Sequence, residues 1–317
     1  LNKNNCIEVM TGAVLPANTD VVIPYEQCKI NACLATVTTY KIALFQNIHI
    51  QGSDAKAGDV LVEKFEKISP AIAGILASVG LAKVEVLRLP AIAICSTGEE
   101  LVDIEQEPEP HQLRRSNIYA LAAALVSEGI NVTIDHLPDE PQQMQAQIKQ
   151  LISKNDAILF SGAVSKGKFD FLPQVLETLG MQLVFHKVAQ KPGKPFLFGR
   201  FTDGPVVFGF PGNPYSTFAC FYIFFYPWLK ASLQQTQVAQ TAVLDTDISF
   251  TPNLDYHVSV KTFMKAGTLF ASPVSGTNSG DLVAIGKADG LLTLPKDKNF
   301  FSSGEVYPLI SFYHNCL

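Results

Sequence analysis

The sequence predicts a multidomain protein of the α/β-plus-β class, in which helices flank a central parallel or mixed sheet. Segments typical of strands and of helices alternate between residues 91 and 229, and this alternation indicates a parallel sheet covered on both faces. Short segments rich in Val, Ile, Thr and Tyr lie before and after that region, which favours a β-rich N-terminal module and a small C-terminal β-barrel. We therefore expect four parts, at residues 1–62, 63–88, 89–235 and 236–317.

The first two parts combine short strands with one helix. Strands are expected over residues 6–10, 20–26 and 33–44, where β-branched and aromatic residues dominate. Ser69 is a favoured N-cap, Pro70 a favoured first helical residue and Gly80 a favoured terminator, so a helix is expected over 69–80. Residues 81–90 then predict a strand that leads into the α/β domain.

The α/β domain begins with a continuous apolar run, which suits a parallel strand buried on both faces. Its strands are expected over 91–95, 131–137, 156–162, 182–188, 195–200 and 205–210, and its helices over 116–129, 138–153, 169–180 and 213–229. Ser116 or Asn117 can cap the first helix, and Gly129 lies past its end. The barrel strands are expected over 242–250, 256–264, 267–274, 290–295 and 305–312.

Composition excludes several classes of function. Lys+Arg 24 against Asp+Glu 29 gives a net charge of −5, so no global basic field favours a nucleic-acid partner. The most apolar segment, 217–229, is shorter than the ~20 residues of a membrane span and contains Pro227, so we expect a core helix. The six cysteines form no CxxC pair, which argues against a zinc ribbon or a redox pair and favours a reducing cytoplasm. The start of the chain resembles no signal peptide and has no initiator Met, so we expect the later part of a longer chain.

Two strand-end loops are candidate anion sites. Ser161, Gly162 and Ser165 follow a buried strand, where backbone amides and hydroxyls can approach a phosphate or an oxyanion. Asp170 ends this loop and is placed for a metal or a proton, although an ordinary turn with Asp170 as a helix cap explains it equally well. The second loop, Pro211, Gly212, Asn213 and Ser216, exposes amides and a hydroxyl to an anion, or is simply a capped Pro/Gly turn.

Charged residues form two further candidate clusters. Lys187, Lys191 and Lys194 lie in a segment stiffened by prolines and fit a polyanion, the alternative being a solvated basic loop. Glu99, Glu100, Asp139 and Asp170 follow three different predicted strands, whose carboxyl ends share one edge of a parallel sheet. Carboxylates that converge there suit Mg²⁺ beside a phosphate, whereas each acid alone is more often a charge at a helix N-terminus. The P-loop and GxGxxG fingerprints are absent.

In combination, these motifs resemble the MoeA-type molybdopterin molybdenumtransferases, the family that includes the E domain of gephyrin. The matching segments are MTGAVLPANTDVVIPYE, AICSTGEELV, RSNIYALAAAL, LFSGAVSKGKFDF, KVAQKPGKPFLFG and GFPGNPYSTFACFY, in the family's order. The resemblance covers almost the whole chain. The central domain alone is shared with Mog-type adenylyltransferases and CinA-like proteins, and the flanking β modules favour MoeA.

The resemblance implies a transferase of molybdenum cofactor biosynthesis. Such an enzyme is a cytoplasmic homodimer that takes adenylylated molybdopterin and molybdate as substrates, hydrolyses the pyrophosphate bond with Mg²⁺ and releases the cofactor and AMP. Other proteins of that pathway are possible partners. By resemblance, the metal-holding residues are Glu100, Asp139 and Asp170, and the catalytic set adds Lys187 and Lys191. The substrate-binding positions are Thr11, Asp54, Thr97, Gly98, Ser161, Gly162, Ser165, Lys194, Pro211, Gly212, Asn213 and Ser216, of which Thr11 and Asp54 come from the partner subunit.

The chain departs from the family pattern at several positions. Arg115 stands where an Asp is common, Ala163 replaces a glycine, and His49 and Gln51 replace part of an Arg-rich run. Val258 lies at the position of a molybdate-contacting Arg, and the N-terminal DGFA-like segment is missing. These departures favour an alternative, a catalytically impaired paralogue that binds a pterin, a nucleotide or a partner. A Mog-like adenylyltransferase is a third hypothesis, which the flanking domains disfavour.

Overall fold

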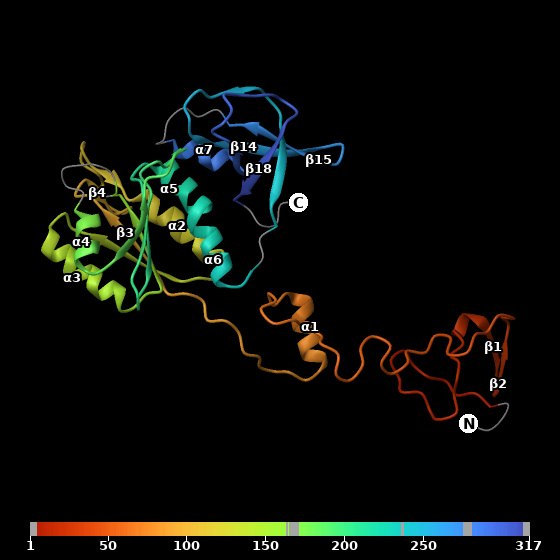
Figure 1. The fold of residues 1–317 in the computed structure, drawn as a ribbon. Helices are drawn as coiled ribbons and strands as arrows, with labels where there is room; N and C mark the ends of the chain where they lie inside the picture. The colour runs from red at the N-terminus through yellow and green to blue at the C-terminus, as the bar shows by residue number, and fades with distance from the viewer. Residues whose placement is uncertain (1–4, 163, 165–170, 236–237, 275–280, 313–317) are drawn as a thin grey trace. The chain divides into compact units, whose positions relative to one another are not determined.

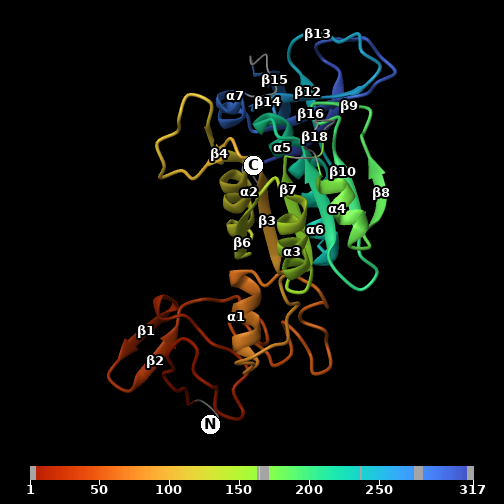
Figure 2. The ribbon, with the colours of Figure 1, turned by 90° about the vertical axis from the view of Figure 1, so that its left-hand side faces the viewer.

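The computed structural model describes residues 5–162, 164, 171–235, 238–274 and 281–312. The chain divides into two compact units, Leu1–Lys83 and Val84–Leu317. Figure 1 shows the ribbon, and Figure 2 shows it turned by 90°. The second unit contains both the α/β domain and the C-terminal barrel.

The first unit contains little regular structure. A 3₁₀ turn, Tyr25–Gln27, leads into an antiparallel hairpin of β1 (Cys28–Asn31) and β2 (Leu34–Val37). The helix predicted over 69–80 is confirmed as α1 (Pro70–Ser78). Its N-cap is also confirmed, because the Ser69 Oγ accepts the Ile72 N–H at 3.3 Å.

The strands predicted over 6–10, 20–26 and 81–90 are wrong, since these residues are irregular or lie in the 3₁₀ turn. Ile7 and Met10 are 53% and 72% exposed, so the apolar residues that suggested a strand pack against no neighbouring strand. The end of the last segment is held by side chains instead. Both terminal guanidinium nitrogens of Arg88 lie 2.9 Å from the Asp156 carboxylate, whose Oδ2 also accepts the Ala91 N–H at 2.7 Å.

Six strands of the second unit form the central mixed sheet, in the order β6-β3-β7-β11-β10-β8. They are β3 (Ile92–Thr97), β6 (Val132–Leu137), β7 (Ala157–Ser161), β8 (Gln182–His186), β10 (Leu197–Arg200) and β11 (Val206–Phe210). β6, β3, β7 and β11 run parallel, whereas β10 is antiparallel to both of its neighbours. The carboxyl ends of β3, β7 and β11 therefore lie side by side at one edge, which confirms the predicted fold class.

Helices cover both faces of this sheet (Figure 1). α3 (Pro141–Ile152) and α4 (Leu172–Thr178) pack on one face, and α2 (Ser116–Val126), α5 (Pro214–Cys220) and α6 (Tyr226–Ser232) pack on the other. The helix predicted over 213–229 is α5, a π-helical turn at Phe221–Phe225 and then α6. Pro227 has no N–H to donate, and the N–H of Tyr226 beside it reaches back to the Phe221 carbonyl, so the wider turn lets the helix continue.

The C-terminal region is a closed five-stranded barrel. Its strands are β12 (Gln240–Leu244), β14 (Asp255–Lys265), β15 (Thr268–Pro273), β16 (Gly290–Leu294) and β18 (Val306–Ser311). The barrel closes because β15 pairs with both β12 and β14. A two-residue strand of the α/β domain, β9 (Gln190–Lys191), pairs in parallel with β14 and so extends the barrel sheet.

Short elements complete this unit. β4 (Leu101–Val102) pairs with β5 (Leu113–Arg114), and β13 (Ile248–Ser249) pairs with β17 (Phe300–Phe301). α7 (Leu282–Lys287) begins at Asp281, whose Oδ1 accepts the Ala284 N–H at 3.0 Å. Among the described residues, no helix is long and apolar enough to cross a lipid bilayer.

A buried ion pair joins the end of α2 to α6. The Lys230 Nζ lies 2.5 Å from the Glu128 Oε2, and the Tyr226 hydroxyl donates to the Glu128 Oε1 at 2.6 Å. The side chains of Lys230 and Glu128 are 9% and 10% exposed. Burial, together with the neighbouring carboxylate, raises the pKa of Tyr226.

We expect Glu128→Ala to lower the free energy of unfolding by about 3–5 kcal/mol, because it leaves the Lys230 ammonium buried without its carboxylate. Urea denaturation of the full chain measures this change. Glu107→Ala is the matched control, because it removes a surface pair with Arg114 in which Glu107 is 93% exposed, and it should leave the midpoint unchanged. Equal effects of the two substitutions would contradict the prediction.

Candidate functional site

The carboxyl ends of β3, β7 and β11 bring three strand-end segments together. Ser161 lies in register with Ser96 of β3 and Phe210 of β11, and the Gly162 N–H donates to the Phe210 carbonyl at 3.1 Å. A Cβ on Gly162 would lie 2.9 Å from the Thr97 Oγ1, and a Cβ on Gly212 would lie 3.9 Å from the Gly162 Cα. Gly162 also has a φ of +101°, so both its conformation and its close neighbours require glycine.

The side-chain amide of Asn117 connects these segments. Its Nδ2 donates to the Gly212 carbonyl at 2.8 Å, to the Ser161 Oγ at 2.9 Å and, more weakly, to the Thr217 Oγ1 at 3.3 Å. Thr217 donates in turn to the Pro211 carbonyl. Asn117 lies in the first turn of α2 and Thr217 in α5, so one network joins two strand ends to two helix starts.

Two of the predicted metal-holding acids lie at the same edge. The Glu99 N–H donates to the Asp139 Oδ2 at 3.3 Å, which brings the segment after β3 to the segment after β6. The Glu100 carboxylate folds over Gly98, where a Cβ would lie 2.6 Å from either carboxylate oxygen. Asp170 and Ser165 lie outside the described residues, and within the described part of the chain no three His, Cys, Asp or Glu side chains cluster as a metal site.

His136 lies beside these acids. Its Nδ1 is 2.8 Å from the Ser96 Oγ. Burial lowers the pKa of His136, the Arg115 guanidinium lowers it further, and the carboxylates of Asp139, Asp135 and Glu100 oppose this shift. The edge therefore carries opposite charges close enough to influence one imidazole.

The lysine segment lies between the α/β domain and the barrel. The Lys187 N–H donates to the Phe196 carbonyl at 2.8 Å, and the Val188 N–H donates to the Lys194 carbonyl at 2.9 Å. A Cβ on Gly193 would lie 2.2 Å from the Cys220 Sγ, so the segment packs tightly against α5. All three lysines are exposed, so their ammonium groups can reach a dissolved anion.

Tyr215, which directly follows the Pro211–Pro214 turn, connects this turn to the barrel. The Tyr215 hydroxyl donates to the His257 carbonyl at 3.1 Å and accepts from the Ser259 Oγ at 2.9 Å. Asn213 directly precedes α5, and Ser216 is buried within it, 4% exposed. Gly212 and Asn213 are exposed, so their backbone groups are more accessible to a ligand than the Ser216 hydroxyl is.

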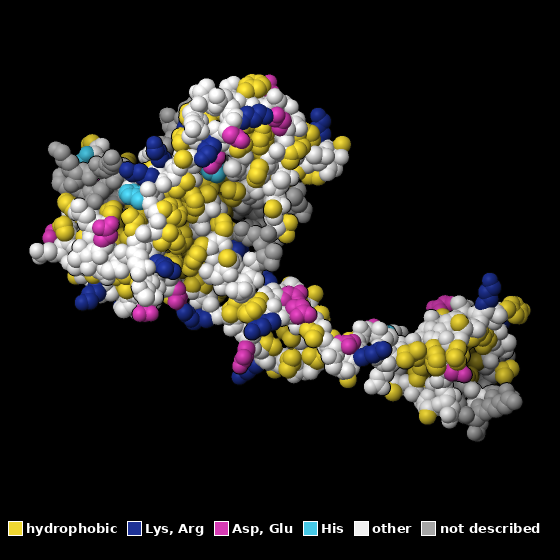
Figure 3. Space-filling model, in the orientation of Figure 1, with side chains coloured by type: hydrophobic (Ala, Val, Ile, Leu, Met, Phe, Trp, Pro, Cys, Tyr) yellow, Lys and Arg dark blue, Asp and Glu magenta, His cyan; other side chains and the backbone are white. Residues whose placement is uncertain are grey.

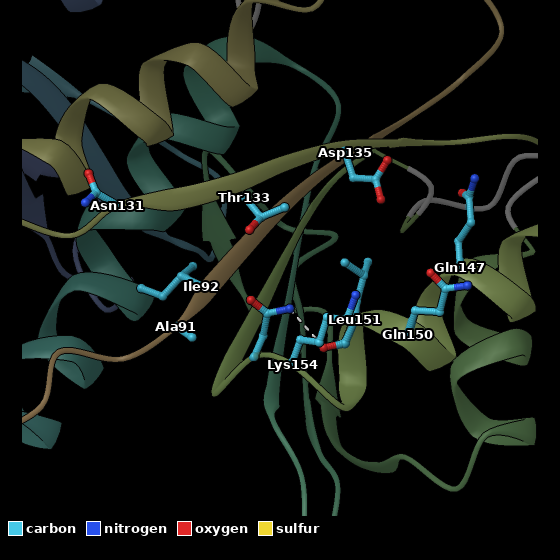
Figure 4. Close-up of a pocket in the computed structure, with 10 residues that line it drawn as sticks. Ala91, Ile92, Asn131, Thr133, Asp135, Gln147, Gln150, Leu151 and Lys154 are labelled. Carbon is cyan, nitrogen blue, oxygen red and sulfur yellow. Dashed lines mark hydrogen bonds between the residues drawn. The ribbon is translucent and has the colours of Figure 1, made fainter.

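A groove of about 280 Å³ lies at the opposite end of the sheet (Figure 4). Figure 4 shows side chains of β6 facing side chains of α3 across it. Its lining includes Ala91, Asn131 and Asn155, which precede β3, β6 and β7. Ligands of parallel α/β sheets bind beyond the carboxyl ends of the strands, so this groove at the amino ends is separate from the candidate site.

Comparison with known proteins agrees with this geometry. Three family models match in succession: the "MoeA N-terminal region (domain I and II)" at residues 1–80, the "Probable molybdopterin binding domain" at 93–231 and the "MoeA C-terminal region (domain IV)" at 241–312. A molybdopterin molybdenumtransferase of Synechocystis is 38% identical over 315 residues, covering 98% of this chain and 78% of the relative. The chain belongs to the MoeA-type molybdopterin molybdenumtransferase family.

Further relatives extend this match. A molybdopterin molybdenumtransferase of Staphylococcus epidermidis is 30% identical, covering 98% of this chain and 74% of the relative. The crystal structure of a MoeA molybdopterin biosynthesis protein from Pyrococcus horikoshii superposes with a TM-score of 0.78 at 28% identity, covering 96% of this chain and 74% of that one. This family acts in molybdenum cofactor biosynthesis, which confirms the predicted functional class.

Two of the predicted substrate-binding residues, Thr11 and Asp54, lie in the first unit. Thr11 lies in a turn, and the Asp54 Oδ2 lies 3.0 Å from the His49 Nε2. The Ser53 Oγ is 3.1 Å from the same nitrogen. His49, one of the departures from the family pattern, therefore contacts Asp54, one of the predicted substrate-binding residues.

Arg115, another departure, is neutralised within the protein. Its guanidinium pairs with Asp103, whose second oxygen accepts the Tyr119 hydroxyl at 2.7 Å. The hydrogen bond from Tyr119 is the largest cause that lowers the pKa of Asp103. Val258 is buried in the barrel core, and Lys261 forms a 2.5 Å ion pair with Asp289, while Ala163 lies outside the described residues.

Sequence reasoning missed Asn117 and Thr217 as parts of the site. Asn117 was expected as a helix cap, but the N-cap position is Arg115 and no side chain caps the helix there. The Asn117 amide instead bonds to residues far along the chain. The adjacent Ser-Asn pair at the start of the helix was the available signal, and its distant partners cannot be read from local spacing.

We expect Asn117→Ala to lower the free energy of unfolding by about 1–3 kcal/mol, because the Gly212 carbonyl and the buried Ser161 hydroxyl lose their donor. Activity should fall further than stability alone explains, because the strand-end segments lose their common anchor. Asn155→Ala is the matched control, since it removes one amide hydrogen bond, to the Leu151 carbonyl at 2.9 Å, at the opposite end of the sheet. Urea denaturation and turnover of both variants check this, and unchanged turnover of Asn117→Ala would refute it.

Proposed function

We propose that this chain inserts molybdate into adenylylated molybdopterin and releases AMP. The main support for this proposal is that Thr97, Gly162 and Gly212 lie close together at one edge of the sheet. The Asn117 amide holds the Gly212 turn there through a hydrogen bond to the Gly212 carbonyl. Closely approaching backbone at the ends of parallel strands suits a phosphate or pterin ligand. The curated relatives in Synechocystis and Staphylococcus epidermidis, which carry the name molybdopterin molybdenumtransferase, support the same activity.

In this proposal the lysine segment neutralises the substrate. Water attacks one phosphorus of the pyrophosphate link in adenylylated molybdopterin, and the bond from that phosphorus to the bridging oxygen breaks. One monophosphate keeps the bridging oxygen and the other gains the oxygen of water, so the products are AMP and the phosphate of molybdopterin. Negative charge grows on the phosphoryl oxygens during this step, and fixed cations lower its energy. Lys187, Lys191 and Lys194 are exposed on a segment that backbone hydrogen bonds and packing hold in place, so their charges are available to these oxygens and to molybdate.

The acids at the strand edge fit a magnesium ion. Carboxylate oxygens are the ligands that Mg²⁺ prefers, and Glu100 and Asp139 both lie beside the Thr97–Gly98 turn. We propose that these two residues hold the ion together with Asp170. When bound, the ion stabilises charge on the phosphate oxygens. Asp139 also accepts the Glu99 N–H, which orients its carboxylate before any ion binds.

A second candidate function rests on Arg115. This residue places a cation, paired with Asp103, where the family commonly has an acid. A paralogue that binds a pterin or a nucleotide without catalysis would tolerate such a change. Calorimetry with adenylylated molybdopterin separates the two functions, because the paralogue predicts binding without turnover.

AMP release from adenylylated molybdopterin in the presence of molybdate and Mg²⁺ tests the activity directly. We expect Asp170→Asn to abolish release while the denaturation midpoint stays close to that of the wild type. Asp203→Asn is the control, because Asp203 is an exposed acid in the turn between β10 and β11. No release by the wild-type chain would reject the activity, and unchanged release by Asp170→Asn would remove this residue from the mechanism.

We also propose that the protein acts as a homodimer. Within the described part of the first unit, Ile72 is the only buried apolar residue. Val14, Tyr40 and Val60 are 95%, 101% and 71% exposed, and Figure 3 shows apolar side chains across the surface of this unit. Apolar surface on this scale marks an interaction site in most proteins. A second copy is the proposed occupant, as the family resemblance implies.

Light scattering of the full chain should therefore give the mass of a dimer. Tyr40→Asp should shift the equilibrium toward monomers, because it places a charge on a side chain that lacks a neighbour within its own unit. Phe300→Asp is the control, since Phe300 is half-exposed on the barrel. A monomer at all concentrations would reject this assembly.

The proposed location is the cytoplasm. Cys6, Cys28, Cys33, Cys95 and Cys220 form no disulfide among the described residues. Burial raises the pKa of the Cys95 and Cys220 thiols, so these two behave as small apolar side chains. Other proteins of molybdenum cofactor synthesis are the proposed partners, because the substrate must be supplied by an adenylylation reaction.

A further inference from the structure

The ammonium group of Lys191 lies beside two aromatic rings of the barrel. Its Nζ is 5.6 Å from the ring centroid of Phe250 and 5.6 Å from that of Tyr256. The two rings stack on each other, with centroids 4.2 Å apart and planes 17° apart. Phe250 is buried in the barrel core, whereas Lys191 is exposed. The cation therefore lies at the boundary between the barrel core and solvent.

Backbone pairing places Lys191 at the rings. Lys191 is in register with Tyr256 in the parallel β9–β14 ladder, and the Asp255 N–H donates to the Ala189 carbonyl at 3.0 Å. On the other side, the buried Gln190 side chain donates to the Pro192 carbonyl at 3.0 Å and to the Cys220 Sγ of α5 at 3.6 Å. The backbone of Lys191 is thus fixed by the barrel and by the α/β domain, while its ammonium group lies beside the two rings.

The faces of aromatic rings attract cations, because the ring quadrupole is negative above and below the plane. Because the two rings stack 4.2 Å apart, an ammonium 5.6 Å from both centroids can lie over the face of only one ring, and the other ring supports that ring by stacking on it. A lysine side chain otherwise samples many rotamers, and binding an anion must select one of them. Rings that hold the ammonium in a narrow region reduce the entropy that anion binding loses. Preorganisation of this kind lowers the dissociation constant without adding a contact to the ligand.

We propose that the stacked Phe250–Tyr256 pair positions Lys191 for the substrate's oxyanions, so that the barrel tunes the affinity of the site. Phe250 and Tyr256 are positioning residues that act through Lys191. This inference rests on the anion-binding role of Lys191 in the proposed function. The barrel would then contribute to substrate binding through Phe250 and Tyr256, although neither residue contacts the substrate itself.

The test uses the full chain and two readouts. One is the KM for adenylylated molybdopterin in AMP release, and the other is the dissociation constant of inorganic pyrophosphate measured by calorimetry. We expect Tyr256→Leu to raise both constants about 3- to 10-fold, with kcat within about twofold of wild type, because the lost interaction acts on binding. Tyr256→Phe retains the ring face and should behave as wild type.

Phe270→Leu is the matched control within the same barrel. It removes the ring that lies 5.7 Å from the Lys265 ammonium, a lysine–aromatic pair of similar geometry outside the lysine segment. Both constants should stay at wild-type values in this variant. A rise equal to that of Tyr256→Leu would mean that general loosening of the barrel is responsible, and it would overturn the proposal.

A double-substitution cycle distinguishes a positioning role of Tyr256 from a merely structural one, because it measures whether the effects on binding of Tyr256 and Lys191 depend on each other. If Tyr256 acts through Lys191, adding Tyr256→Leu to Lys191→Ala changes neither constant further. Additive effects would overturn the proposal. If Tyr256→Leu fails to fold, pentafluorophenylalanine at position 256 keeps the ring shape but withdraws electron density from its face. It should weaken pyrophosphate binding as Tyr256→Leu would, and wild-type affinity would overturn the inference.

Different results would reject the anion-binding role of Lys191 and the positioning role of the rings. Unchanged pyrophosphate binding by Lys191→Ala would reject the anion-binding role of Lys191 and, with it, this inference. Weaker binding by Lys191→Ala together with wild-type binding by the ring variants would reject only the positioning role. Pyrophosphate binding that depends on both Lys191 and the rings, in a protein that releases no AMP, would reject the activity and retain the positioning role.

Discussion

The hydrogen bonds of the Asn117 amide are the interaction on which the geometry of the site depends. One side chain from the start of α2 donates to the end of β7 and to the turn after β11. Parallel strands place their carboxyl ends at a common edge of the sheet. The backbone hydrogen bonds between strands stop where the strands end, so the turns beyond them need other hydrogen bonds to hold them together. A short side chain with two amide protons supplies that connection at low loss of conformational entropy. Gly162 follows the Ser161 that Asn117 holds, and the pairing of β3 with β7 brings it close to Thr97.

Much of the second unit could be predicted because its segments follow simple periodic patterns. The apolar run at 91–95 and the small residues after it correspond to β3 and its turn. In the first unit, the capped segment at 69–80 corresponds to α1. The strand predictions at 6–10 and 81–90 failed for a physical reason. Alternating apolar residues fit a strand only when a neighbouring strand is available, and that neighbour is not encoded in the segment itself.

The sequence predicted the loops that form the candidate site. It could not predict the interactions between those loops. Side chains such as Asn117, Tyr215 and Gln190 bond to residues that are distant in sequence, so no spacing rule identifies their partners. Arg115 illustrates the same limit. As a charge in the sequence it suggested an altered pocket, but its effect on the site depends on Asp103, which lies in a separate short segment and neutralises it.

The pairing of β9 with β14 also constrains the order in which the protein becomes functional. Gln190 and Lys191 belong to the α/β domain, yet their ladder partners Asp255 and Tyr256 are synthesised much later in the chain. The lysine segment therefore makes contacts of high contact order, which form slowly because a long loop must close first. The ladder partners of the central mixed sheet all lie before the barrel in the chain, whereas the segment with the three lysines acquires its final geometry only when β14 of the barrel has folded. A chain that lacks the barrel would therefore lack the strand that pairs with Gln190 and Lys191.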